Sequence, residues 1–327
     1  MAIKITRRDI LKTAAVAAAG GLVPLRALAQ SDSGQSAASG QPKRVLRFAH
    51  LTDSHVQPEL GAPEGLARCI RHALGHADKP ELIIHGGDHI MSAFGEDAAR
   101  TKLQWDLYQR IFKDECPVPV ESCIGNHDIW GWDKTKSGTT GSEPNYGKKW
   151  ALDVLGLSSA YRTFDRAGWR FIILDSVQPD GALFRGELDP PQYDWLTEQL
   201  SRTPREMPVI IVSHIPIFST TPFMAMRGAE ADGREWKIPA LAMHIDARKI
   251  MALFDEHPSV RLCLSGHTHL LDRVEYNGVT YICDGTICGA KWRGPSQRTR
   301  EGYGMIDLFD DGSFVHQYHT YGWEARL

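Results

Sequence analysis

The chain has 327 residues, of which 42% are hydrophobic and 24% charged, and its 37 Lys and Arg against 40 Asp and Glu give a formal net charge of −3 at pH 7. This composition is that of an ordinary globular protein and excludes coiled-coil and low-complexity chains. With a sequence pI of about 6.5, the chain lacks the strong positive charge with which proteins bind duplex nucleic acid, so we expect no such partner.

The N-terminus has the features of an export signal. Arg7 and Arg8 precede an apolar stretch over residues 13–25, and Ala27-Leu28-Ala29 supplies a small-x-small cleavage pattern. The segment resembles a twin-arginine signal peptide, with an amphipathic helix as the alternative, and its apolar stretch is too short to span a membrane. We therefore expect residues 1–29 to engage the twin-arginine export machinery, leaving a periplasmic or secreted protein with no stable membrane anchor after cleavage.

A single domain is predicted after the signal. Residues 30–43 are rich in Ser, Gly, Gln and Ala and are predicted to form a disordered linker, followed by one domain over residues 44–327. Short apolar runs in this domain alternate with helical patterns, which predicts an α/β protein. The predicted strands are residues 45–51, 82–85, 118–124, 171–174, 209–212 and 261–264. The predicted helices are residues 63–75, 98–113, 191–201 and 247–257.

Two β-hairpins are predicted in the C-terminal third, which makes this part antiparallel. Their turns are at Asn277-Gly278 and Asp311-Gly312, and both dipeptides favour tight turns with positive φ. The flanking strands are residues 274–276 and 279–283 in the first hairpin, and 305–309 and 314–319 in the second.

Two long polar segments, residues 129–150 and 218–240, lack periodicity and are predicted to be loops at the rim of a functional site. The second segment carries five large apolar side chains. These side chains could form a lid, but we expect them to be buried against the domain: Phe218, Phe223, Met224, Met226 and Trp236.

The six cysteines contain no Cys-x-x-Cys motif, which disfavours a zinc ribbon or a thioredoxin-like site. An oxidising compartment would permit a Cys283–Cys288 or a Cys116–Cys123 disulfide. Free thiols are the interpretation that we favour.

Polar side chains follow five of the predicted strands. Because ligands of α/β sheets bind beyond the carboxyl ends of strands, these side chains can converge in one crevice. Each signal alone is weak, since Asp-x-His recurs at Asp255 and His257, and it is the ordered set that is informative. The set comprises Asp53 and His55, Asp88, Asn126 with His127 and Asp128, His214, and His267 with His269.

The residue types in this set indicate transition metals. Carboxylate oxygens, an amide oxygen and imidazole nitrogens suit Mn, Fe, Zn or Co better than Ca. Seven such groups are too many for one tetrahedral zinc ion, but they suit two metals about 3.5–4 Å apart that share a carboxylate. The seven are Asp53, His55, Asp88, Asn126, His214, His267 and His269.

The ordered motifs resemble those of the calcineurin-like metallophosphoesterase superfamily, over about residues 44–290. The matching segments are Asp53-x-His55, Gly87-Asp88, Gly125-Asn126-His127-Asp128, His214 and Gly266-His267-x-His269. The resemblance implies a β-sandwich flanked by helices, in four αββα layers, with two divalent or trivalent ions of Mn, Fe or Zn at the strand ends.

The resemblance also implies a role for each residue. Asp53, His55, Asp88 and His269 would hold one metal, and Asp88, Asn126, His214 and His267 the other, with Asp88 bridging. His127 would act as an acid toward the leaving oxygen, and Asp128 would orient the His127 ring. The implied reaction is attack by a metal-bridging hydroxide on a small-molecule phosphate mono- or diester.

Departures from better-known branches narrow the assignment. The Gly-Asp-x-x-Asp-Arg-Gly signature of Ser/Thr protein phosphatases is absent, and Met91 stands where purple acid phosphatases have a tyrosine ligand. The layout is closer to the bacterial class III cyclic-nucleotide phosphodiesterase-like and general phosphohydrolase branches. Two alternatives remain: a nucleotide-linked pyrophosphatase using the same residues, and a non-catalytic metal-binding scaffold of the same fold.

Overall fold

The structure is a computed structural model that describes residues 41–225 and 230–326. The predicted signal peptide and residues 30–40 of the predicted linker lie outside the described residues, as does Met226. The chain divides into two units, Met1–Gln41 and Pro42–Leu327, and the second contains all the elements described below.

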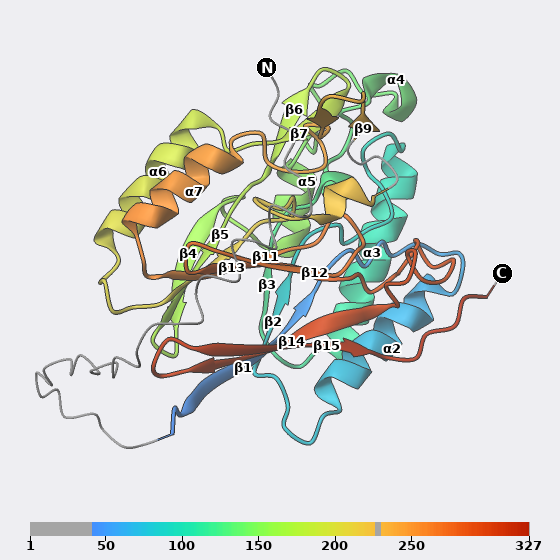
Figure 1. The fold of residues 1–327 in the computed structure, drawn as a ribbon. Coiled ribbons are helices and arrows are strands. Elements are labelled where there is room, and N and C mark those ends of the chain that lie inside the picture. The colour runs from blue at the N-terminus through green and yellow to red at the C-terminus, as the bar shows by residue number, and fades with distance from the viewer. Residues whose placement is uncertain (1–40, 226–229, 327) are drawn as a thin grey trace, which may run out of the picture. The chain divides into compact units, whose positions relative to one another are not determined.

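Two β-sheets form the centre of this second unit (Figure 1). The five-stranded sheet has the order β15-β14-β1-β2-β3, in which β1 pairs parallel with β2 and antiparallel with β14. Its strands are β1 (Arg44–Leu51), β2 (Leu82–His85), β3 (Val120–Ser122), β14 (Gly302–Phe309) and β15 (Phe314–Thr320). The N-terminal strand of the domain is therefore central in its sheet.

The six-stranded sheet has the order β12-β13-β11-β8-β5-β4. Its four middle strands are parallel, and antiparallel strands flank them on both edges. Its strands are β4 (Arg162–Arg166), β5 (Trp169–Ile173), β8 (Val209–Val212), β11 (Val260–Ser265), β12 (Asp272–Tyr276) and β13 (Val279–Cys283).

Helices cover the outer faces of the sheets. α2 (Ala62–Leu74) and α3 (Ala98–Glu115) pack on the five-stranded sheet, and α6 (Pro190–Arg202) and α7 (Ala247–Glu256) pack on the six-stranded sheet (Figure 1). The N-cap carboxylates of Asp97 and Asp189 accept hydrogen bonds from the first turns of α3 and α6, which fixes where these helices begin. The four-layer αββα architecture predicted from sequence is confirmed.

A continuous apolar core joins the two sheets. Phe48 of β1 packs edge-on against Phe171 of β5, with ring centroids 5.7 Å apart, and Phe164 of β4 stacks on the same ring. Fully buried Leu, Ile and Val side chains of both sheets fill the remaining space. Burying such side chains contributes about 1.5–3 kcal/mol each, so this core fixes the two sheets relative to each other.

The connections contain more regular structure than the sequence predicts. The segment 129–150 holds α4 (Lys134–Ser137) and the start of α5 (Lys149–Leu155), and 218–240 holds the short pair β9 (Glu230–Ala231) and β10 (Trp236–Lys237). A further hairpin, β6 (Val177–Asp180) with β7 (Leu183–Gly186), was not predicted. Two 3₁₀ turns cover Asn126–Asp128 and Thr221–Phe223.

The predicted strand 118–124 is shorter in the structure, because only Val120–Ser122 pair with β2 before the chain turns into the 3₁₀ segment. The Asn277-Gly278 turn has the expected positive φ at both residues (48° and 80°). In the last hairpin only Gly312 is left-handed (φ 79°), because four residues rather than two connect β14 to β15.

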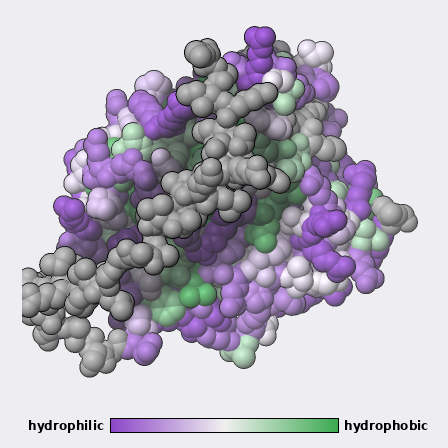
Figure 2. All heavy atoms as spheres, viewed as in Figure 1, coloured by the Kyte–Doolittle hydropathy of each residue, from purple (hydrophilic) through white to green (hydrophobic). Residues whose placement is uncertain are grey.

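The expected burial of the apolar segment is wrong for three of its side chains. Phe223, Met224 and Trp236 are 38%, 67% and 60% exposed. The face of the molecule shown in Figure 2 carries hydrophilic residues with smaller hydrophobic areas between them. Phe218 does pack against the core, next to Tyr281. Trp236 lies in the short β9–β10 pair, and Phe223 and Met224 lie in and directly after a 3₁₀ turn; among the described residues, neither of these elements pairs with the two main sheets.

All six cysteines are free, so neither candidate disulfide forms. Five of the six are buried, and burial raises the pKa of Cys69, Cys123, Cys263 and Cys283. These four thiols behave as small apolar core groups with little thiolate character.

The packing of α2 gives a first prediction. Gly65 lies directly against the buried Trp292, and a Cβ at this position would overlap the indole ring. We expect Gly65→Ala to lower the free energy of unfolding by about 1–3 kcal/mol, because overpacking outweighs the better helix propensity of Ala. Urea denaturation measures the change. The exposed neighbour provides the control, since Glu64→Ala should shift stability by less than about 0.5 kcal/mol; equal stability of both variants would contradict the tight contact.

Candidate metal centre

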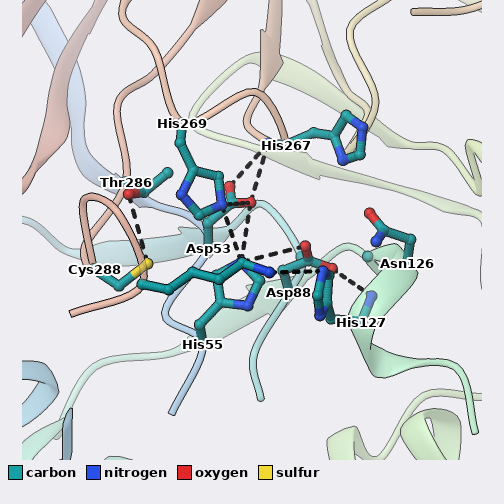
Figure 3. A network of polar contacts seen from close by, with 12 residues as sticks. Asp53, His55, Asp88, Asn126, His127, His267, His269, Thr286 and Cys288 are labelled. Carbon is teal, nitrogen blue, oxygen red and sulfur yellow. Dashed lines mark hydrogen bonds and ion pairs between the residues drawn. The ribbon is translucent and has the colours of Figure 1, made fainter. Parts of the chain in front are cut away.

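The predicted site residues lie at one end of the sandwich, in loops that follow strands of both sheets. β1, β2 and β3 of the five-stranded sheet lead into the first four residues, and β8 and β11 of the other sheet lead into the rest. Figure 3 shows Asp53, His55, Asp88 and His269 turned toward one another. The structure brings together all seven residues predicted as metal ligands, which are Asp53, His55, Asp88, Asn126, His214, His267 and His269.

The backbone at these positions is strained. Five of the seven residues have a left-handed conformation, which costs non-glycine residues about 1–3 kcal/mol each and is concentrated at functional sites. The five are Asp53 (φ 53°), His55 (φ 40°), Asp88 (φ 54°), His267 (φ 69°) and His269 (φ 60°). The loops also approach closely, because a Cβ at Gly125 would overlap the Asp88 side chain. The Gly of the Gly-Asn-His-Asp segment is therefore required sterically.

The first half of the site joins the β1 loop to the β11 loop. His55 Nε2 lies 3.0 Å from His269 Nε2, and His269 Nε2 lies 3.3 Å from Asp53 Oδ1. Asp88 Oδ2 is 3.5 Å from His55 Nε2. The structure therefore brings together Asp53, His55, Asp88 and His269, the residues predicted for the first metal, with His55 Nε2 near the other three.

The second half of the site uses the same Asp88 oxygen. His214 Nε2 lies 3.4 Å from Asp88 Oδ2, 3.1 Å from Asn126 Oδ1 and 3.3 Å from His267 Nδ1. Asp88 Oδ2 thus contacts one histidine from each half. This shared oxygen is the geometry expected of a carboxylate that bridges two metals.

Backbone carbonyls fix the orientation of three of the histidines. The ring nitrogen facing away from the site lies 2.8 Å from Gly86 O in His214, 2.8 Å from Leu241 O in His267 and 2.6 Å from Gly289 O in His269. A carbonyl only accepts hydrogen bonds, so each of these nitrogens carries a hydrogen and the opposite nitrogen of the neutral ring presents a lone pair to the site. Nitrogen lone pairs and carboxylate oxygens that converge in this way repel one another unless a cation lies between them. The residue types and their arrangement therefore fit metal ions.

The ionisation of the site reflects the same concentration of negative charge. Burial disfavours the charged form of Asp53, but hydrogen bonds from His269 and His55 outweigh it and hold the pKa of Asp53 well below its ordinary value. Burial also opposes ionisation of Asp88, but electrostatic attraction to His214 and His127 holds its pKa well below the ordinary value. Burial also opposes protonation of His214, yet the Asp88 and Asp53 carboxylates outweigh it and raise the pKa of His214 to about 9. Burial and the nearby His214 lower the pKa of His267 to about 4.

His127 lies beside the first half of the site. Its ring packs edge-on against the His55 ring, with centroids 4.6 Å apart, and its Nδ1 donates to Met91 O at 2.6 Å. Its backbone N–H donates to Asp88 Oδ1 at 2.7 Å. Burial lowers the pKa of His127 well below its ordinary value, so an imidazolium here would give up its proton readily.

The predicted role of Asp128 is wrong. Its carboxylate accepts hydrogen bonds from the backbone N–H groups of Asp88, His89 and Gly125, and contacts the His89 ring at 2.8 Å, whereas both ring nitrogens of His127 face other groups. The reason is that the 3₁₀ turn directs the consecutive side chains of His127 and Asp128 to different sides. Asp128 instead joins the loop after β2 to the loop after β3.

Sequence reasoning missed residues from one segment, the loop that follows β13. Cys288 Sγ lies within 4.8 Å of ligand nitrogens of His55 and His269 and is buried there. Lys291 Nζ lies 3.4 Å from His127 Nε2. No motif marks these residues in the sequence, and only the chain path after β13 brings them to the site.

The chain belongs to the calcineurin-like phosphoesterase family, which matches residues 46–271. The match confirms the family predicted from the ordered motifs and supports a hydrolase that acts on phosphate esters. Residues 4–24 match the twin-arginine translocation signal sequence, which confirms the predicted export signal. Within the described residues, no helix is long and apolar enough to cross a membrane.

Two relatives are similar in sequence. A 3′,5′-cyclic-nucleotide phosphodiesterase of Nostoc sp. is 27% identical over 168 residues, which cover 49% of this chain and 56% of the relative. A probable cyclic nucleotide phosphodiesterase of Synechococcus sp. is 26% identical over 286 residues, which cover 84% of this chain and 92% of the relative. The chain thus spans just over half of the first relative and nearly all of the second.

A solved structure, that of a dimetal phosphatase from Danio rerio, has a TM-score of 0.59 with 16% identity and covers 85% of this chain and 97% of that protein. This likeness shows a shared fold.

The raised pKa of His214 makes metal binding pH-dependent. Below pH 9 the metal-free site holds a proton on His214 that a metal must displace, and the pKa of His269 is raised as well, so apparent affinity should fall at least about tenfold per pH unit as the pH drops from 9 to 6. Titration calorimetry of the metal-free protein with Mn²⁺ in buffers of different ionisation enthalpy measures both the affinity and the protons released. Affinity that is constant between pH 6 and 9 would contradict the proton competition.

Proposed function

We propose that the mature protein is a dinuclear metal-dependent phosphoesterase that hydrolyses small phosphate mono- or diesters outside the cytoplasm. The observation that carries the proposal is the Asp88 carboxylate, whose Oδ2 faces His55 at 3.5 Å and His214 at 3.4 Å. Each of these histidines belongs to a separate set of ligand atoms. Two cations that share one carboxylate match this arrangement.

The ligand sets divide at Asp88. Asp53, His55 and His269 would complete one set, and Asn126, His214 and His267 the other. When bound, two transition metals would supply Lewis acidity toward phosphoryl oxygens and would lower the pKa of a coordinated water to about 7. Three of the four ligand histidines are held in the required tautomer by carbonyls, so little reorganisation accompanies metal capture.

His127 is the residue of this chain that we propose for proton transfer to the leaving oxygen. With Nδ1 held by Met91 O, its Nε2 is the atom left to exchange a proton with substrate. Burial lowers the pKa of His127, so the free ring is neutral and Nε2 must first take up a proton in the complex with the anionic substrate; that proton is then held weakly and passes readily to the leaving oxygen. Asp128 supports this geometry only through the backbone of the loops.

The first experiment is hydrolysis of a panel by the mature protein reconstituted with Mn²⁺, Zn²⁺ or Fe²⁺. The panel contains p-nitrophenyl phosphate, bis-p-nitrophenyl phosphate, cyclic nucleotides and nucleotide-sugar diphosphates. Cyclic nucleotides are included because both sequence relatives bear the name of cyclic-nucleotide phosphodiesterases. Turnover that requires two metals per chain supports the proposal, and silence of the fully loaded protein across the panel would contradict it.

Removing the bridging charge should abolish metal binding and activity together. We expect Asp88→Asn to lose at least one of the two metals, because a neutral amide offers one weak ligand oxygen in place of a carboxylate shared by both sets. Metal content by elemental analysis and turnover of the panel measure the two effects. Asp311→Asn, in an exposed turn, is the matched control. An Asp88→Asn variant with full activity would rule out the shared carboxylate.

Replacing His127 should separate chemistry from metal binding. We expect His127→Ala to keep both metals and to lose about 10²–10⁴-fold in kcat, because it removes only the proton donor. The loss should shrink for esters with good leaving groups such as p-nitrophenolate, which need little protonation. Unchanged kcat for esters with poor leaving groups would remove His127 from this role.

A further inference from the structure

The loop that follows β13 has an unusual backbone at two adjacent positions. Lys291 (φ 54°) and Trp292 (φ 70°) are both left-handed, although neither residue type favours this conformation. Such strain persists only where the surrounding structure holds it. Hydrogen bonds within the loop do so, from Trp292 N to Cys288 O at 2.7 Å and from Ala290 N to Gly294 O at 2.7 Å.

Trp292 anchors this loop to the metal centre. Its indole N–H donates to the carbonyl oxygens of Ser54 and His55 at 3.1 and 3.0 Å, and its fully buried ring packs against Gly65 and edge-on against Trp323. The anchor therefore contacts the same short segment that carries His55. Lys291, the residue just before it, is placed relative to the site by these contacts.

The Lys291 ammonium has no carboxylate partner. Its Nζ lies 3.4 Å from His127 Nε2, and the ion pairs found among the described residues include none between Lys291 and an Asp or Glu. Lys148 differs, because its ammonium is bound by both oxygens of Asp175 at 2.6 and 2.7 Å and is neutralised there. A partly buried cation beside the reacting position, without a counter-ion of its own, is suited to bind an anionic substrate.

We infer that Lys291 binds a non-bridging phosphoryl oxygen of the substrate beside His127, and thereby favours phosphomonoesters over diesters. The inference rests on the proposed phosphoesterase function. A monoester carries a second negative charge on an oxygen that a diester replaces with an ester group. A fixed cation near that oxygen stabilises the dianion more than the monoanion.

The test compares two esters with the same leaving group, p-nitrophenyl phosphate and bis-p-nitrophenyl phosphate, at pH 8 on the metal-loaded protein. We expect Lys291→Met to reduce kcat/KM for the monoester about 10–100-fold, mainly through KM, and for the diester by less than about threefold. Lys291→Arg should restore most of the monoester activity. Arg293→Met, an exposed cation two residues away, is the matched control and should change neither ester.

A binding measurement makes the test independent of turnover. Inorganic phosphate, a dianion at pH 8, should bind the metal-loaded wild type at least about tenfold more tightly than Lys291→Met by titration calorimetry. Lys291→Asn provides a second variant whose side chain tolerates the left-handed backbone, so a folding defect in one variant does not decide the result. Equal losses for both esters, or unchanged phosphate affinity in both variants, would overturn the inference. If the metal-loaded wild type turns over neither these two esters nor any other member of the panel, the proposed function fails, while phosphate binding still decides the role of Lys291.

Discussion

The predicted ligand atoms of the site repel one another, and the rest of the structure holds them close together in spite of this repulsion. The buried carboxylates of Asp53 and Asp88 and several imidazole nitrogens lie close together, which places negative charge and lone pairs in one small space. The two-sheet core makes this possible, because Phe48 and Phe171 fix one sheet against the other and so hold His55 and His214 on opposite sides of Asp88. Cations, or protons in their absence, are what allow the two halves to stay this close.

Stability has been given up locally to build this arrangement. Five of the seven predicted ligand residues have left-handed backbones, and Lys291 and Trp292 add two more in the neighbouring loop. The strain is held by rigid supports outside the reacting groups: the Asp128 carboxylate, which binds three backbone N–H groups, and the Trp292 indole, which binds two carbonyls. Both supports act on backbone, so they position ligands without competing for metal or substrate.

The sequence predicted which residues lie together at the site because their signal is local. Each lies within a few residues of the end of an apolar strand, and parallel strands bring such ends together, so order along the chain was enough to identify Asp53 through His269. Asp128 shows the limit of this reasoning. It follows His127 directly in the motif, but the 3₁₀ turn points the two side chains in different directions, so they do not contact each other. Lys291 and Cys288 reach the site only through the path of the chain after β13, which no periodicity encodes. The exposure of Met224 and Trp236 depends on whether another part of the chain packs over them, and the composition of their segment does not indicate this.

The central place of β1 also has a consequence for biosynthesis. Among the described strands, β1 is the first to be synthesised, yet it pairs with β14, which lies some 250 residues later in the chain. His267, His269 and the Trp292 anchor are also synthesised late. A nascent chain that ends before β11 holds only part of each ligand set. On the proposed ligand sets, both metal sites would be complete only in the finished polypeptide, and the metal concentrations of the compartment where folding is completed would decide which ions are captured.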